Sequence, residues 1–337
     1  MATTSAATDT PMPLTLRRRQ LGALALAPLM RAPLAATAAW PTRSINLVVP
    51  YPPGGTNDNV ARIVAKRLQD DTGQGVVILN KGGAGGLIGT AQVAQAAPDG
   101  YTLLSASIGN IAIAPQLMKA DFDPFGDLVP VAYCGGGRAT VAVHPSLPVK
   151  TLAELVAYAK ERPGKLTYGT SGIGTPGHLS GETLKQLAGI DIRHVPYRGS
   201  APAVTDAVAG HVDMAFDPLS TPFIKSGALR GLAFFGGPTP PADLPGLPSM
   251  AQAGIKGWED ALAGSFYIVA PRRTPADVLA RVRERLAAVL RDPGTVRALA
   301  AVQVVVEPLT LEQTERQIHA VHDLAQRLIA AGRITAE

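Results

Sequence analysis

A regular alternation of buried-strand and amphipathic-helix patterns constrains the fold of this chain more than any other feature. Residues 45–49 form an apolar run rich in branched side chains, which is typical of a buried strand. Apolar residues then recur at helical spacing from Val60 to Leu68. The alternation continues with an expected strand at 76–79, a helix at 87–97 and a strand at 101–104. This strand–helix order predicts a parallel sheet with helices on its faces.

The same order returns in the middle of the chain. Thr151 and Glu154 are spaced as a capping box, and the helix that they begin ends near residues 162–164. Three further strands are expected at 166–168, 193–195 and 212–216, with helices opening at Thr175 and Ser200. A second capping box at 310–313 opens the last helix. We therefore expect an α/β protein.

The chain length and composition predict two lobes. With 337 residues, of which 46% are hydrophobic, the chain is long enough for two cores at roughly 150 residues per domain. The most economical division makes one lobe from residues 40–104 plus 230–337 and the other from residues 105–229. A ligand cleft is expected between the two lobes, closed by a hinge motion.

Residues 1–39 have the pattern of an export signal. Arg17, Arg18 and Arg19 precede a short apolar stretch at 21–30, and a small-residue cleavage pattern follows at 35–39. The pair of arginines before Gln and Leu also fits a twin-arginine signal, so both export routes stay open. The apolar stretch is shorter than the roughly 20 residues needed to span a membrane. We expect a periplasmic protein that begins near Trp40.

Charge and cysteine content exclude several classes of protein. Residues 1–39 carry four arginines and one aspartate, so they supply three of the five formal positive charges. The remaining sequence shows no basic run of the kind that nucleic-acid binding requires, and no nucleic-acid partner is expected. Cys134 is the only cysteine, which excludes an intrachain disulfide.

Three loops have the composition of anion-binding turns. Residues 50–58, 170–178 and 195–200 each follow an expected strand, contain glycine, and lead into an expected helix. Glycines let the backbone approach a ligand closely, and a helix N-terminus presents unpaired amides and partial positive charge. Thr56 or Asn57 is expected to cap the first of these helices. Each loop could also be a purely structural turn.

The chain resembles the Bug (TctC-like) receptors of tripartite tricarboxylate transporters. The motifs that carry this resemblance extend over most of residues 40–337: Pro50-x-Pro52-Pro53-Gly54-Gly55-x-x-Asp58, Gly83-Ala84-Gly85-Gly86-x-x-Gly89, Ala97-Pro98-Asp99-Gly100-Tyr101-Thr102-Leu103, Ser171-Gly172-x-Gly174-Thr175-x-x-His178-Leu179, Val195-Pro196-Tyr197-Arg198-Gly199, Thr205-Asp206 and Gly210-x-Val212-Asp213. The resemblance implies a periplasmic binding protein of the type II fold. It also implies a small organic acid as the ligand: a di- or tricarboxylate, an acidic amino acid or an aromatic acid.

The resemblance further implies which residues hold the ligand. Backbone amides, hydroxyls and waters of two facing loops, 52–58 and 171–178, would grip a carboxylate. We expect donors from both walls, loop support by Asp58 and His178, and a wall and a distal end formed by the remaining residues of the set: Pro52, Gly54, Gly55, Thr56, Asp58, Ser107, Asn110, Ser171, Gly172, Thr175, His178 and Tyr197. The implied partners are membrane permease subunits, and the protein is expected to be a monomer.

Cofactor binding, metal binding and catalysis have less support in the sequence. The glycines at 83–86 depart from a dinucleotide-binding fingerprint, and no cofactor, metal or catalytic residue is expected. Asp213 and Asp217, near a strand end, are expected to cap or to serve as a hinge rather than to act as an acid–base pair. Two alternatives stay open: a receptor that signals to a membrane kinase, and an enzyme on the same scaffold.

Overall fold

The structure is a computed structural model that describes residues 40–258 and 264–330. These residues belong to one compact unit. The expected export signal at residues 1–39 lies outside the described residues. Within the described ranges, no helix is long and apolar enough to cross a membrane. The fold is mixed α/β with two sheets, as the sequence predicts.

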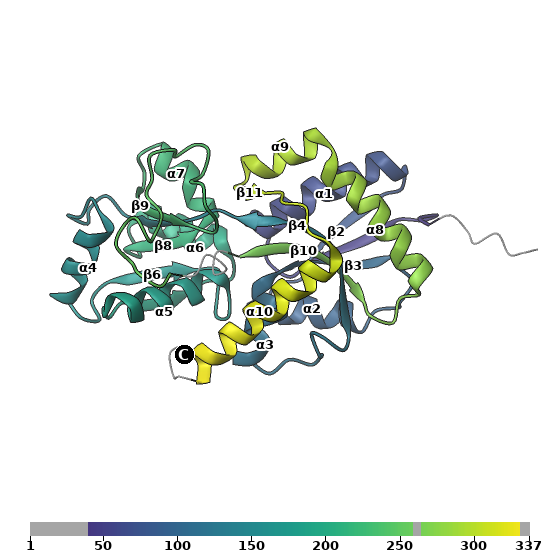
Figure 1. The fold of residues 1–337 in the computed structure, drawn as a ribbon, viewed down its shortest axis with the longest axis horizontal. Coiled ribbons are helices and arrows are strands. Elements are labelled where there is room, and N and C mark those ends of the chain that lie inside the picture. Colours follow the sequence, from purple (N-terminus) through teal and green to yellow (C-terminus); the bar gives the residue numbers. More distant parts are fainter. Residues whose placement is uncertain (1–39, 259–263, 331–337) are drawn as a thin grey trace, which may run out of the picture. The chain divides into compact units, whose positions relative to one another are not determined.

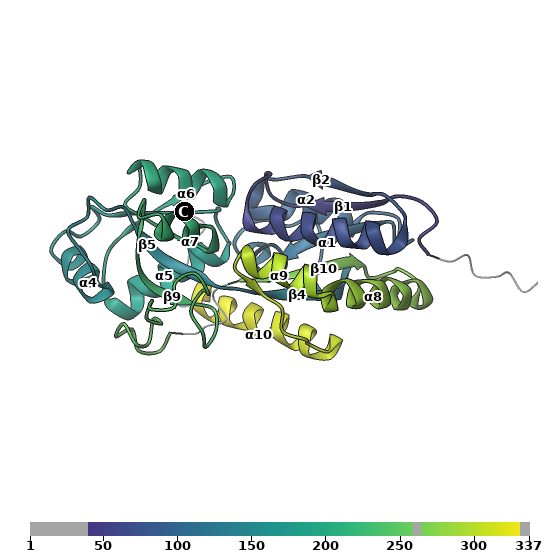
Figure 2. The ribbon, with the colours of Figure 1, turned by 90° about the horizontal axis from the view of Figure 1, so that it is seen from above.

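The first sheet has six strands in the order β11-β4-β10-β3-β1-β2. Figure 2 shows β2 at one edge of this sheet and β4 toward the other. Strands β1, β2 and β3 pair in parallel, whereas β4, β10 and β11 form antiparallel pairs. The strand bounds are Ile45–Val49 (β1), Val76–Asn80 (β2), Thr102–Ser107 (β3), Leu128–Gly137 (β4), Ser265–Pro271 (β10) and Val304–Val305 (β11).

Helices cover both faces of this sheet (Figure 1). One face packs against α1 (Thr56–Thr72), α8 (Ala276–Arg291) and α9 (Pro293–Ala301). The other face packs against α2 (Leu87–Ala94) and α10 (Leu311–Ala330), with the short segments η1 (Ala84–Gly86), η2 (Gly109–Ile113) and α3 (Ala114–Leu117) nearby. Neighbouring strand residues alternate between these two cores, as the pleat of a strand requires. Burial on both faces explains the nearly continuous apolar strands.

The second sheet has five strands in the order β7-β6-β8-β5-β9. Its strands are Ala139–Val143 (β5), Thr167–Thr170 (β6), Arg193–Pro196 (β7), Met214–Asp217 (β8) and Arg230–Phe235 (β9). Strands β6, β7 and β8 are parallel, and β5 pairs antiparallel with β8 and β9. The helices around it are α4 (Leu152–Lys160), α5 (Pro176–Ala188), α6 (Ser200–Ala209) and α7 (Thr221–Lys225), with η3 at Pro218–Ser220.

The expected lobe boundaries at residues 104 and 229 need correction. Strand β4 lies in the six-stranded sheet, and β9 lies in the five-stranded sheet. The chain passes from one sheet to the other between Gly137 and Ala139. Lobe 1 therefore consists of 40–137 and 264–330, and lobe 2 of 138–258. Both misplaced strands are antiparallel, so the strand–helix alternation along the sequence does not indicate which sheet they join.

Both expected capping boxes are present. The Thr151 hydroxyl accepts a hydrogen bond from the Glu154 amide, and the Glu154 carboxylate accepts one from the Lys150 amide. Thr310 and Gln313 bond reciprocally through their side chains and amides. The expected cap of α1 by Thr56 or Asn57 is wrong, because Gly55 occupies the cap position without a side-chain bond. This leaves the side chains of Thr56 and Asn57 inside the first helical turn.

Candidate functional site

Three helices begin at one cavity between the two lobes. The first turns of α1, α5 and α6 all contribute to its walls. The cavity has a volume of about 60 Å³. Its lining residues are Tyr51, Gly55, Thr56, Asn57, Ser107, Ala139, Ser171, Pro176, Gly177, Ser200, Phe216, Asp217, Pro218, Phe235, Gly264 and Phe266. We call it the central cavity.

The sheet topology explains why the helices meet there. Strand β1 has β2 on one side and β3 on the other, and β6 has β7 on one side and β8 on the other. At both places the order of the strands reverses, and ligands of open α/β sheets bind in the crevice at such switch points. The loops that follow β1 and β6 are therefore the ones that topology brings to the cavity.

The cavity favours an anion without a cationic side chain. Among the described residues that line it, none is Lys or Arg. The first amides of a helix have no partner within the helix, and its N-terminus carries roughly half a positive charge. The side chain of Asn57 adds further donor and acceptor groups: it is buried, and neither its Oδ1 nor its Nδ2 has a hydrogen-bond partner among the described residues. Such a group requires an occupant to bond with.

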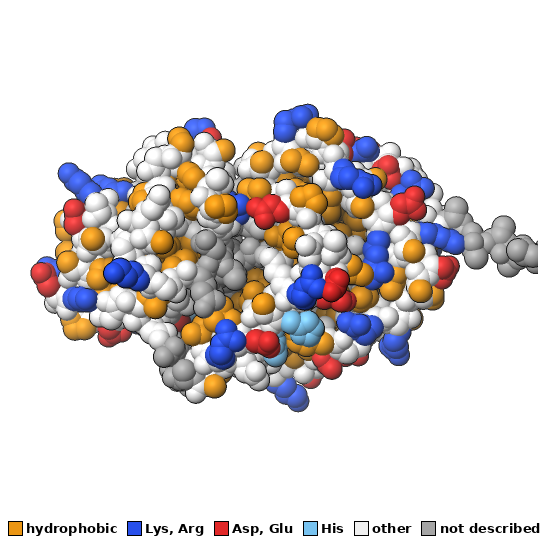
Figure 3. All heavy atoms as spheres, in the orientation of Figure 1, with side chains coloured by type: hydrophobic (Ala, Val, Ile, Leu, Met, Phe, Trp, Pro, Cys, Tyr) orange, Lys and Arg blue, Asp and Glu red, His pale blue; other side chains and the backbone are white. Residues whose placement is uncertain are grey.

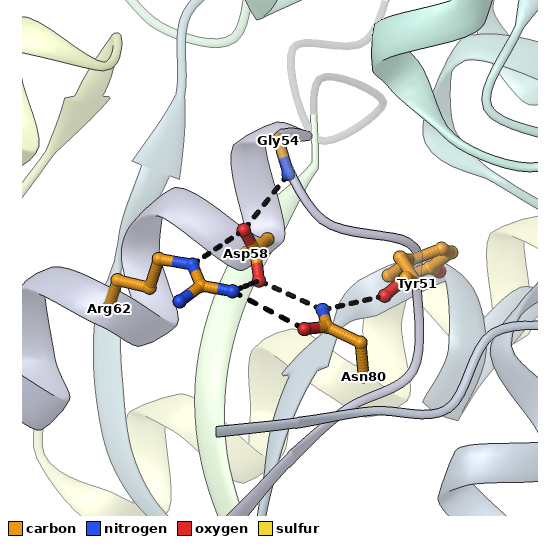
Figure 4. Close-up of polar contacts among 5 residues, drawn as sticks. All are labelled: Tyr51, Gly54, Asp58, Arg62 and Asn80. Atoms are coloured by element: carbon orange, nitrogen blue, oxygen red, sulfur yellow. Dashed lines mark hydrogen bonds and ion pairs between the residues drawn. The ribbon is translucent and has the colours of Figure 1, made fainter. Parts of the chain in front are cut away.

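Asp58 supports the first loop, as expected. Its carboxylate accepts hydrogen bonds from the Gly54 amide at 2.9 Å, from Asn80 at 2.8 Å and from Arg62 at 2.8 Å. Figure 4 shows this network, in which Asn80 also donates to the carbonyl oxygen of Tyr51 at 3.0 Å. Burial raises the pKa of Asp58, but these hydrogen bonds outweigh burial and hold it below its usual value. Asp58 does not line the central cavity.

The loop after β6 is supported by neutral groups. We expected Thr175 to donate to the ligand. Its hydroxyl instead donates to the Gly172 carbonyl at 2.6 Å, so its one proton is used within the loop. The Gly174 amide donates to Nδ1 of His178 at 3.3 Å. The ring of His178 stacks on that of His194, with 4.2 Å between centroids. Burial lowers the pKa of His178 to about 4 and that of His194 to about 3, so both rings are neutral near pH 7.

A second hollow, the outer crevice, adjoins the central cavity. It is lined by Tyr51, Pro52, Gly83–Gly86, Met118, Ser171–Ile173 and Pro196–Arg198. Tyr51 and Ser171 line both hollows. The Tyr51 hydroxyl bonds with the Ser107 hydroxyl at 3.0 Å and donates to the Gly85 carbonyl at 3.2 Å. Burial raises the pKa of Tyr51 to about 12. Hydrogen bonds thus hold Tyr51 in place where it lines both hollows.

The structure sorts the twelve expected site residues into three groups. Gly55, Thr56, Ser107 and Ser171 line the central cavity. Pro52, Gly172 and Tyr197 line the outer crevice, as does Ser171 again. The remaining five line neither hollow and lie in the supporting loops and elements: Gly54, Asp58, Asn110, Thr175 and His178. Asn110 is fully buried, and it accepts from the Ser107 amide at 2.7 Å and donates to Thr90 at 2.7 Å.

Several lining residues were not among the expected site residues. Asn57 was read only as a cap, and Phe216, Phe235 and Phe266 come from three different strands. Asp217 was expected to cap, and it does accept from the Leu219 amide at 2.9 Å. It also lines the central cavity, which the sequence does not indicate. A carboxylate at the end of a strand, just before a helical turn, is the signal that could have identified it.

Two α/β lobes around a shared cavity, with converging helix N-termini, define a solute-binding protein of the periplasmic-binding-protein fold. Comparison with known proteins agrees. Residues 60–332 match the family described as "Tripartite tricarboxylate transporter family receptor" (TctC), and the chain belongs to that family.

Relatives of this chain include curated and solved proteins. The BugT protein of Bordetella pertussis is 36% identical over 274 residues, which cover 80% of this chain and 83% of that protein. The solved structure of Rpa4515 from R. palustris with adipate has a TM-score of 0.83 at 34% identity, covering 88% of this chain and 99% of that one. The solved periplasmic binding protein BugD has a TM-score of 0.80 at 32% identity, covering 88% of this chain and all of that one.

Proposed function

We propose that this protein is a periplasmic receptor that captures a small organic acid and delivers it to membrane permease subunits. The observation that carries this proposal is the convergence of three helix N-termini on a cavity with no lysine or arginine in its described lining. A relative solved with adipate supports a dicarboxylate as the ligand. Both walls of the cavity come from a single chain, which supports action as a monomer.

The physical logic suits a receptor that must also release its ligand. Each helix N-terminus stabilises an anion by about 0.3–1 kcal/mol, and by up to about 2 kcal/mol where the contact is partly buried. Several such contacts hold a carboxylate without the strong pairing of a buried arginine. The aromatic rings of Phe216, Phe235 and Phe266 would contact the carbon chain of the ligand. The ligand is thus recognised as an anion with an apolar body.

Within this proposal, the expected site residues take three roles. Gly55, Thr56 and Ser171 would donate to the ligand together with Asn57 and Gly177, because all five line the central cavity. Pro52, Gly172 and Tyr197 would form the entrance at the outer crevice. Gly54, Asp58, Asn110, Thr175 and His178 would hold these groups in place. Export by the twin-arginine route is the finer proposal for localisation, supported by Arg18-Arg19-Gln20-Leu21.

Thermal denaturation with a panel of organic acids tests the proposal. A ligand at 100 times its dissociation constant adds about 2.7 kcal/mol to the stability. For a protein of this size the midpoint should rise by roughly 4 °C. We expect such a rise with adipate or another di-, tri- or aromatic carboxylate. No shift with any acid of the panel would contradict the proposal, and chemical conversion of a bound acid would identify an enzyme instead.

Asn57→Leu provides a matched test of the site. The substitution removes polar atoms that have no protein partner, so it should not destabilise the ligand-free protein. It should weaken acid binding by about 10-fold or more, because a buried hydrogen bond to a charged group is worth about 1.5–3 kcal/mol. Asn59→Leu, on the same helix but outside the cavity lining, should leave the affinity unchanged. Equal affinities of the two variants in calorimetry would remove Asn57 from the site.

A further inference from the structure

Asp217 is an unexpected group in a cavity that binds an anion. It is 5% exposed, and it is the one residue with a carboxyl side chain among the described residues lining the central cavity. Its Oδ2 accepts from the Ser200 hydroxyl at 2.6 Å, and its Oδ1 accepts from the Leu219 amide at 2.9 Å. These two bonds use only part of its hydrogen-bonding capacity, because a carboxylate has about four acceptor sites. Asp217 can therefore also meet a ligand.

The groups that face Asp217 do not titrate near neutral pH. They are the Ser200 hydroxyl from α6, the Leu219 amide from η3, the Thr56 hydroxyl from α1 and, across the ladder, Thr140 of β5. The Tyr51 phenol also lines the cavity, but burial raises its pKa to about 12, so it stays neutral. None of the described residues that line the central cavity is a lysine or arginine that could compensate the charge of an ionised Asp217.

The charged and titratable groups on the elements packed against β8 are engaged with one another. Glu182 of α5 accepts from Tyr168 of β6 at 2.5 Å and pairs with Lys185 at 2.8 Å. His178 stacks on His194 of β7. Asp206 of α6 accepts from Tyr197 at 2.6 Å, and on α1 Asp58 pairs with Arg62. None of them contributes to the pKa shift of Asp217. Burial raises this pKa, and the hydrogen bonds from Ser200 and Leu219 offset the rise only in part.

A carboxylate that enters the cavity shifts the protonation equilibrium of Asp217 toward the neutral form. The cavity is about 60 Å³, so a ligand carboxylate inside it would come within a few ångström of Asp217. Like charges within roughly 4–6 Å of one another disfavour the ionised form. A protonated Asp217 would instead donate a hydrogen bond to the carboxylate through Oδ2. The Leu219 amide would keep donating to Oδ1, and the Ser200 hydroxyl would turn away from the protonated oxygen by rotation.

We propose that Asp217 takes up a proton when the central cavity captures a carboxylate, so that the receptor selects an anion together with one proton. The inference rests on the proposed function and adds a charge-selecting residue to it. Binding and protonation are then linked, and each strengthens the other by the same factor. Asp217 thereby lets the cavity discriminate between two kinds of ligand. A purely anionic ligand requires Asp217 to be protonated, whereas a ligand with an ammonium group would pair with ionised Asp217.

Calorimetry of adipate binding to the purified protein tests this linkage without any substitution. The titration is repeated at one pH in buffers of different ionisation enthalpy, and the dependence of the apparent enthalpy on the buffer gives the number of protons bound. We expect uptake of about 0.5–1 proton per adipate at pH 7–8. The dissociation constant should rise by up to about 10-fold per pH unit between pH 6.5 and 8.5. In this range a dicarboxylate is fully ionised, because carboxyl groups titrate near roughly pH 4.

Asp217→Asn is the matched variant, because an amide imitates the protonated carboxyl group in shape and charge. It should bind adipate at pH 8.5 more tightly than the parent protein, with no proton uptake and with less than about 2-fold change across the same pH range. Ser200→Ala provides a second variant that keeps Asp217 titratable. Removing a donor to the ionised form raises the pKa of Asp217, so the pH at which affinity starts to fall should move upward.

The outcomes separate this inference from the proposed function. Adipate binding by the parent protein with no proton uptake at any pH would overturn the inference and leave the receptor role standing. Tighter binding of an amino-bearing acid, again without proton uptake, would also overturn it, because Asp217 would then be ionised and paired with an ammonium. No binding of adipate or of any other carboxylate by either protein would overturn the proposed function itself.

Discussion

The loops that start α1 and α5 perform the same task with different chemistry. Each follows the first strand of a parallel unit, lies at a switch point of its sheet, and presents helix amides to the central cavity. In lobe 1 the loop is tied by a carboxylate, Asp58, with a half-exposed arginine on its outer side. In lobe 2 the loop is tied by threonine hydroxyls and a stacked pair of neutral histidines.

The difference shows where charge is tolerated near an anion site. The Arg62 side chain is 51% exposed and does not line the central cavity, so solvent screens its charge. Lobe 2 avoids charge altogether in its loop support. Over the surface, by contrast, acidic and basic side chains are interspersed on the face shown in Figure 3. Charged side chains are thus plentiful on that face and sparse among the described residues lining the central cavity, where Asp217 is the one carboxylate.

Removing the Asp58 carboxylate, which supports the loop of lobe 1, should lower the stability more than any other change to the two loops. Asp58→Ala leaves the Gly54 amide and one of the two N–H groups of the Asn80 side chain without an acceptor. We expect a loss of about 2–3 kcal/mol in the free energy of unfolding, because unpaired buried donors each cost about 1–3 kcal/mol. The loop should also present its amides less well, so acid affinity should fall. Urea denaturation and calorimetry measure both effects.

Asp70→Asn is the matched control for Asp58→Ala. Asp70 lies on the same helix and pairs with Lys66 at 3.0 Å, but both side chains are exposed. An exposed pair contributes roughly 0–1 kcal/mol, so this variant should keep nearly full stability and unchanged affinity. Equal losses in the two variants would mean that Asp58 has no special role in the loop.

A glycine substitution at the start of each helix should have a smaller and unequal effect. A Cβ on Gly177 would lie 2.6 Å from the carbonyl oxygen of Phe216, so Gly177→Ala forces α5 away from β8. A Cβ on Gly55 would meet Ser200 at an ordinary 3.6 Å, and its φ of −81° suits any residue. We expect a loss of about 1–2 kcal/mol for Gly177→Ala and less than about 0.5 kcal/mol for Gly55→Ala. Thermal unfolding of both variants would settle the contrast, and equal midpoints would refute it.

Much of the fold follows from local sequence patterns, whereas the cavity depends on tertiary pairing. Strand β1 is found at the expected residues 45–49, because an apolar run between turn signals is a local pattern. The lobe assignment of β4 and β9 was wrong, because antiparallel strands add to a sheet without a helical crossover to announce them. The same limit hid Phe235 and Phe266, which lie on β9 and β10.

The site was predictable to the extent that it consists of loops after strands. Gly55, Thr56 and Ser171 were expected from such loops, and they line the central cavity. Thr175 was expected to donate to the ligand, but its hydroxyl turns inward to Gly172, and no local pattern distinguishes these two orientations. Burial of Asp217 is likewise a property of packing from α1, α6 and β5, not of its own neighbours in sequence.

Acidification should lower the stability through His178 and His194 of lobe 2 before it acts through Asp58. This effect should be smaller than those expected for Asp58→Ala and Gly177→Ala. Burial depresses the pKa of His178 and His194 to about 4 and about 3, whereas unfolded histidines titrate near roughly 6.5. The unfolded chain therefore binds more protons below that pH, so their contribution to stability is complete above it and declines as the pH falls toward 4. Asp58, with its pKa below the usual value, loses its contribution only below about pH 4.

His194→Asn should reduce the loss of stability between pH 8 and pH 6 by about 1 kcal/mol. The control is His211→Asn, at a side chain that is 70% exposed, and it should leave the loss as it is in the parent protein. Urea denaturation at the two pH values measures the difference, and an identical pH dependence in all three proteins would show that the stacked rings are not what makes lobe 2 sensitive to acid.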